Sequence, residues 1–97
     1  MNEVDATTAQ RKATAWLISQ VGNLLMGDAP ALVIGQRTVW RVPVLLTSPS
    51  HGVIGQVGAV DVDATSGQVL ADPMLAQELV THAHNLRRKT SRGRLSR

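Results

Sequence analysis

The sequence contains no cysteine, no phenylalanine and no tyrosine, and its large aromatic rings are limited to Trp16 and Trp40. Without cysteine the chain can form no disulfide, no thiolate metal site and no cysteine nucleophile. Proteins that bind single-stranded nucleic acid combine several aromatic faces with a basic groove, and this chain has too few rings for that arrangement. The core must therefore be filled by Val, Leu, Ile and Ala.

Long hydrophobic runs are also missing. No stretch approaches the roughly 18 apolar residues of a membrane span. The first residues, MNEVDATTAQRK, lack the basic start and the apolar run of a secretory signal. We therefore expect a cytoplasmic protein. Its 97 residues, 43% of them hydrophobic, suit one domain with one core.

Acidic residues are absent from the last part of the chain. All seven Asp and Glu precede residue 79, whereas six of the ten Lys and Arg lie in the last eleven residues. We expect residues 1–88 to form the single domain, and residues 89–97 to form a basic, disordered tail because KTSRGRLSR is charged and has no periodicity. The candidate partner-binding residues are the six cations of this end: Arg87, Arg88, Lys89, Arg92, Arg94 and Arg97.

Two segments show the spacing of three to four residues that is typical of amphipathic helices. The first covers residues 6–26, with Gly27 positioned to end it and Gly22 as a weak point. The second covers residues 73–88, with Asp72 as the N-cap. Its apolar stripe consists of Leu75, Leu79, Ala83 and Leu86.

Four strands are expected between these helices, over residues 32–36, 38–47, 53–63 and 68–71. Side chains of the second strand point alternately to its two faces. One face carries Trp40, Val42, Val44 and Leu46, and the other carries Val39, Pro43 and Leu45. We expect Trp40 to lie buried between the sheet and the first helix, near Leu17 and Val21. The third strand changes parity, which predicts a bulge near Gly58, and Gly67 is placed for positive φ in the following turn.

The predicted fold is thus α+β, a single domain in the order α-β-β-β-β-α, with an antiparallel four-stranded meander sheet and both helices on one side. Residues 32–70 resemble the PepSY-like family in the strand VWRVPVLL, the strand and turn GAVDVDATSG, and the return QVL. That resemblance implies binding or inhibition of a protease or peptide, with no cofactor and no catalytic residues.

Asp61 and Asp63 fall on one strand face, and paired carboxylates can hold a metal or move a proton. We interpret them as scaffolding. Asp63 is expected to accept hydrogen bonds from the turn amides of Thr65 or Ser66, and Asp61 to stand in solvent. A calcium or magnesium site would need more oxygen ligands than this hairpin offers.

The histidines give no stronger metal signal. His82 and His84 are two residues apart on a helix and point in opposed directions, so they cannot chelate one ion. Glu78 and His82 share a helix face, but two ligands without a third are weak evidence. We expect no metal and no cofactor.

No catalytic constellation is recognisable in the sequence. His51 lies in a loop with Ser48 and Ser50, but a serine nucleophile needs an oriented base, and no G-x-S-x-G context is present. The glycines at positions 52, 55 and 58 lack the context of a phosphate-binding loop, and GVIG matches the KH-domain loop by accident. We therefore expect a protein that is not an enzyme.

Three functions compete on this basis. The first is a non-catalytic protein-interaction module, expected to form a homodimer and to inhibit or regulate a partner enzyme. The second is an antitoxin-like inhibitor whose basic arm binds an acidic nuclease, with Arg92 or Arg94 entering a carboxylate-lined metal site. The third is non-specific binding of nucleic acid through the tail. The sequence ranks nucleic acid below a protein partner because residues 1–86 carry a net charge of −3.

Overall fold

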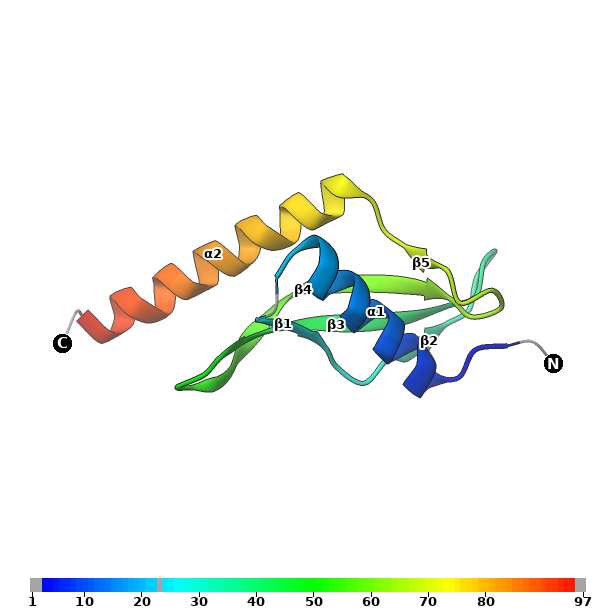
Figure 1. Ribbon diagram of the computed structural model, residues 1–97, viewed down its shortest axis with the longest axis horizontal. Coiled ribbons are helices and arrows are strands. Elements are labelled where there is room, and N and C mark those ends of the chain that lie inside the picture. The colour runs from blue at the N-terminus through cyan, green and yellow to red at the C-terminus, as the bar shows by residue number, and fades with distance from the viewer. Residues whose placement is uncertain (1–2, 23, 96–97) are drawn as a thin grey trace.

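A computed structural model describes residues 3–22 and 24–95, with side chains described as far as Lys89. Figure 1 shows two helices packed over the same face of one antiparallel sheet. The predicted α+β architecture is confirmed. The elements in chain order are α1 (Ala6–Gln20), β1 (Leu25–Gly27), β2 (Ala31–Val33), β3 (Val39–Ser48), β4 (Gly52–Asp63), β5 (Val69–Leu70) and α2 (Pro73–Leu95).

The sheet has five strands rather than the four expected. Its order is β1-β3-β4-β5, and β2 pairs with β3 on the same side as β1. The added strand is β1, which the sequence placed inside the first helix. That helix ends at Gln20, and the amides of Val21 and Gly22 both donate to the carbonyl of Leu17. Leu25 then pairs with Leu46 of β3.

Aspartates begin both helices, and the cap at Asp72 was predicted. Asp5 Oδ1 accepts the Thr8 amide at 2.8 Å, and Asp72 Oδ1 accepts the Leu75 amide at 2.9 Å. Each bond satisfies an amide that has no partner within its helix. The hydrogen bonds to Thr8 also hold the pKa of the Asp5 carboxyl below its ordinary value.

The bulge predicted near Gly58 is confirmed in β4. Val44 pairs with Gly58 but Leu45 pairs with Gln56, which leaves Val57 as an extra residue in β4. One extra residue reverses the facing of the strand beyond it. Gly67 in the next turn has a φ of +79°, also as predicted.

The core lies between the helices and the covered face of the sheet. Leu17 of α1 and Leu79 of α2 are its largest helical members, at 0% and 1% exposure. Alternate residues of β3 and β4 form the sheet side of the core, because one face of each strand points toward the helices. The residues of this cluster are Ala9, Ala13, Leu17, Leu25, Val42, Val44, Leu46, Val57, Val60, Val62, Leu79 and Ala83.

Glycines in the sheet make room for α2. A Cβ at Gly58 would lie 2.7 Å from Cδ2 of Leu79, and a Cβ at Gly55 would lie 3.0 Å from Cδ2 of Leu86. The two leucines are seven residues apart, which is about two helical turns. The spacing of these glycines therefore serves helix packing.

Trp40 does not lie where the sequence placed it. Its ring is half-buried, and its Nε1 donates to the carbonyl oxygen of Val4 at 2.7 Å. Trp40 therefore packs beside the segment that enters α1, whereas the prediction put it near Leu17 and Val21, further along the helix. The difference arises because β3 begins beneath the start of α1.

The second helix is longer than predicted. The sequence pattern predicted that the helix ends at Arg88 and that residues 89–97 form a disordered tail, but the backbone is helical as far as Leu95. Lys, Arg and Leu are good helix formers, and no proline follows Pro73. Basic side chains also stabilise the negative end of a helix dipole. The last two residues lie outside the described part of the chain.

Candidate interaction surfaces

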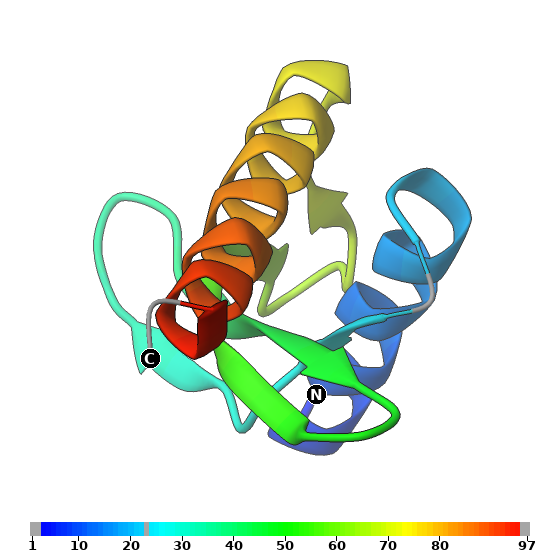
Figure 2. The same ribbon diagram turned by 90° about the vertical axis from the view of Figure 1, so that its left-hand side faces the viewer.

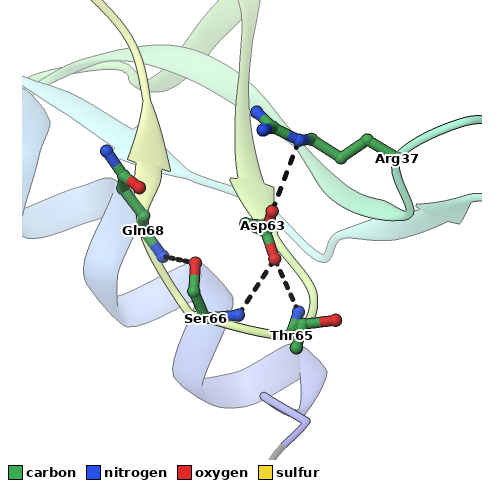
Figure 3. Close-up of polar contacts among 5 residues, drawn as sticks. All are labelled: Arg37, Asp63, Thr65, Ser66 and Gln68. Carbon is green, nitrogen blue, oxygen red and sulfur yellow. Dashed lines mark hydrogen bonds and ion pairs between the residues drawn. The ribbon is translucent and has the colours of Figure 1, made fainter.

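The carboxylate hairpin is held together by its own hydrogen bonds (Figure 3). Asp63 Oδ1 accepts the amides of Thr65 at 2.8 Å and Ser66 at 2.9 Å, and the Gln68 amide donates to Ser66 Oγ at 3.1 Å. Arg37 Nε lies 3.5 Å from Asp63 Oδ2. The Ser66 and Thr65 amides hold the pKa of Asp63 below its ordinary value. The predicted turn-capping role of Asp63 is confirmed.

Asp61 is not free in solvent, so that part of the interpretation was wrong. It forms a bidentate ion pair with its cross-strand neighbour Arg41. Arg41 Nε donates to Asp61 Oδ1 at 2.9 Å, and Arg41 Nη2 donates to Asp61 Oδ2 at 3.0 Å. The carboxylate raises the pKa of the Arg41 guanidinium, first through these hydrogen bonds. Each carboxylate of the hairpin thus already has a cationic partner. No group of three or more His, Asp or Glu suited to a metal occurs in the described ranges.

His82 has a packing role. Its Nδ1 lies 3.0 Å from the carbonyl oxygen of Val57, the bulge residue of β4, so the ring can donate to that oxygen. A bulge residue is left out of the normal ladder pairing, and its carbonyl needs another donor when it is partly buried. This contact could not be predicted from the sequence, because it depends on the place where α2 crosses β4.

The Ser48, Ser50 and His51 side chains do come together, in the turn between β3 and β4. Ser50 Oγ lies 3.0 Å from His51 Nδ1 and 3.2 Å from Ser48 Oγ, and the Ser50 amide also donates to Ser48 Oγ. Both serines are exposed or half-exposed and His51 is exposed. These bonds join near neighbours in one turn, and no further described side chain is shown orienting the imidazole. The arrangement is that of a polar turn.

A shallow groove of about 250 Å³ lies where α1 ends and α2 continues over the sheet. Ligand pockets usually measure roughly 300–1,000 Å³ and enclose most of the ligand. The groove is therefore small for a ligand pocket. Its lining residues are Val21, Gly22, Leu24, Leu25, Leu46, Val80, Ala83, His84 and Arg87.

The face of the sheet opposite the helices carries an apolar cluster, which we call the open-face patch: Met26, Pro43, Leu45 and Ala59. Met26 pairs with Leu45 across β1 and β3, and Pro43 pairs with Ala59 across β3 and β4. Met26 is 40% exposed, and the other three are half-buried. Val39 was expected to share this surface, but it is only 6% exposed and does not contribute.

The second surface is the basic end of α2, which consists of Arg87, Arg88 and Lys89 together with Arg92 and Arg94 in the following helical turns. The side chains of the first three are exposed. None of these three forms an ion pair with another described residue. The sequence predicted these cations as partner-binding residues, and the structure places them on a helix. Arg97 lies outside the described residues.

Comparison with protein families, with curated proteins and with solved structures found no match. The resemblance of residues 32–70 to PepSY-like domains therefore stays a prediction. Within the described residues, no helix is both long enough and apolar enough to cross a membrane.

Proposed function

We propose that the protein is a non-catalytic protein-interaction module that forms a homodimer through the open-face patch. The observation that carries the proposal is the position of this patch: both helices lie over the other face of the sheet (Figure 2), while Met26 is 40% exposed and Pro43, Leu45 and Ala59 are half-buried. Clustered apolar side chains on three adjacent strands favour burial against a second surface.

Association of two faces is favoured over pairing of sheet edges. The strands β1 and β2 have three residues each, and β5 has two. Strand β4 is also an edge over Gly52–Val60, which β5 does not reach, but there the Val57 carbonyl already bonds to His82 of α2. Short edges offer little backbone to pair with another chain. Strand β3 has ten residues and pairs with β4 along its whole length, so these two strands give a face of roughly 30 by 10 Å, or about 300 Å², which the short strands widen locally. Standard interfaces bury about 800 Å² per partner, which makes this a modest dimer.

Charges around the patch suit a second copy of the same surface. The Arg41–Asp61 and Arg37–Asp63 pairs give this face two cations and two anions. In a twofold interface the same surface meets itself, so a face of balanced charge avoids net repulsion. The basic end of α2 could not meet itself in this way. The open face is thus the better surface for self-association.

Sedimentation over a range of protein concentrations tests the proposal. The parent chain should pass from monomer to dimer, and Met26→Glu should remain monomeric because it places a charge in the apolar contact. The matched control is Val80→Glu on α2, since Val80 is 42% exposed and lies on the other side of the sheet. The control should still dimerise. A parent chain that stays monomeric at every concentration, or dissociation in the control alone, would overturn the proposal.

A further inference from the structure

The basic end of α2 extends beyond the body of the protein. Leu79 and Leu86 pack against Gly58 and Gly55 of the sheet. Further along the helix, Lys89 lines a groove together with sheet residues, and its side chain is the last one described. The helix continues to Leu95, which adds about 9 Å at 1.5 Å per residue. Figure 1 shows this end reaching past the sheet, and Figure 2 looks onto it from outside. The exposed side chains of Arg87, Arg88 and Lys89 lie where the helix leaves the sheet.

The cations are spread around the helix rather than gathered in a stripe. Consecutive helical residues are 100° apart, so Arg87, Arg88 and Lys89 together span about 200° of the circumference. The nearest acidic residue earlier in α2 is Glu78, about 13 Å back along the axis. Asp61 already pairs with Arg41 on the opposite face of the sheet. Arg87, Arg88 and Lys89 form no ion pair with the described acidic residues, whose charge counted against nucleic acid in the sequence.

This distribution of charge distinguishes two kinds of anionic partner. A flat acidic protein surface lies on one side of a helix and would reach only part of the ring of cations. The major groove of B-form DNA is about 12 Å wide, admits one α-helix, and has phosphates along both walls. A helix with cations on several sides can contact both walls at once. We propose that the basic end of α2 binds B-form DNA by lying in the major groove.

Two further considerations agree with a duplex partner. The described part of this helix end has no aromatic ring on which an unpaired base could stack, and stacking is the main contact of proteins that bind single strands. The negative end of the helix dipole opposes a phosphate, but it amounts to only about half a charge. Three described cations outweigh it.

Binding of this kind has a calculable salt dependence. The logarithm of the binding constant falls with the logarithm of salt concentration by about 0.9 for each phosphate neutralised on B-DNA. Arg87, Arg88 and Lys89 alone give a slope of about −2.7, and Arg92 and Arg94 bring it to about −4.5. Removing two cations should reduce the steepness by about 1.8.

The experiment measures fluorescence anisotropy of a labelled, mixed-sequence DNA duplex against the full chain at several salt concentrations. The test variant is Arg87→Gln with Arg88→Gln. The matched control is Arg11→Gln with Lys12→Gln, which removes two exposed cations from α1 and changes net charge equally. The test variant should bind at least tenfold more weakly at low salt with a shallower slope, and the control should bind as the parent does. Melting curves confirm that both are folded.

Three competitors complete the test. A single strand of the same length and an A-form RNA duplex, whose major groove is too narrow for a helix, should each bind more weakly than the DNA duplex. Polyglutamate stands for an acidic protein and should also bind more weakly. Absence of duplex binding at low salt, equal losses in both variants, or a competitor that binds as tightly as the duplex would overturn the proposal. Tight binding of polyglutamate would assign this helix end to an acidic protein.

Discussion

The seating of α2 on β4 at Gly58 can be tested by adding one methyl group. In Gly58→Ala the new carbon would lie 2.7 Å from Cδ2 of Leu79, whereas carbon atoms in contact usually stay about 3.5 Å apart or more. Leu79 is 1% exposed, so it has little room to move. Overpacking of this kind costs about 1–3 kcal/mol. Gly58 does not have a positive φ, so alanine fits the backbone and recovers about 0.4–1 kcal/mol from the unfolded chain.

The expected net loss for Gly58→Ala is thus about 1–2 kcal/mol in the free energy of unfolding. Leu79→Ala alone should cost about 2–5 kcal/mol because it empties a buried site. In the double variant the new methyl group occupies part of that space, so the combined loss should fall short of the sum by about 0.5–3 kcal/mol. This coupling is the specific consequence of direct contact between the two positions.

Urea unfolding followed by fluorescence of Trp16 and Trp40 gives the required free energies, provided that the slopes agree between variants. The control is Gly22→Ala, since a Cβ there meets nothing within 4 Å. It should lose no stability, and the same backbone effect should raise its free energy of unfolding by about 0.4–1 kcal/mol. Losses that simply add in the double variant would show that Leu79 does not rest on Gly58, and the account of the glycine spacing would then fail.

Two further changes probe the hairpin and the entrance to α1. The pKa of Asp63 is lowered by the Ser66 and Thr65 amides, so its contribution to stability is present above about pH 4 and is lost as the pH falls further. Thermal melting from neutral to acidic pH should therefore show a smaller acid loss for Asp63→Asn than for the parent, and parallel curves would contradict this. Trp40→Phe removes the donor to the Val4 carbonyl and should cost about 1 kcal/mol in urea unfolding. Unchanged stability would show that this hydrogen bond contributes nothing.

Local sequence signals predicted the features that depend on few residues. The Asp72 cap, the positive φ of Gly67 and the bulge near Gly58 were all read from short patterns, because each satisfies a backbone requirement within its own segment. The turn bonds of Asp63 belong to the same group. Such features change little with the way in which the elements pack.

The end of the first helix was missed because its periodicity continues through Leu24 and Leu25. Leu24 and Leu25 fit the helical spacing, although they belong to the segment that forms β1 and packs beside the helix. What decides between the two is Gly27, where a Cβ would lie 3.0 Å from Thr14 Oγ1 and 2.8 Å from Val42 Cγ1. The Gly27 amide also donates to Thr14 Oγ1 at 3.1 Å. This close approach of β1 to α1 is visible only in three dimensions.

Contacts between distant segments were missed for the same reason. The Arg41–Asp61 pair depends on the register of β3 against β4, and the His82 contact depends on the crossing point of α2. Neither follows from spacing along the chain. The candidate surfaces were partly predictable: the sequence identified the cations of the basic end and the apolar positions Pro43 and Leu45, but not Met26.

The two proposed surfaces lie on opposite sides of the sheet, so they can act independently. A dimer formed through the open-face patch buries the uncovered sides of both sheets and leaves α2 of each copy on the outside, because α2 lies over the covered face. Each dimer then presents two basic helix ends, one on each outer side. A monomeric Met26→Glu chain keeps one such end with its charges unchanged. Self-association and DNA binding are therefore tested by separate measurements. Disproof of one proposal leaves the evidence for the other unchanged.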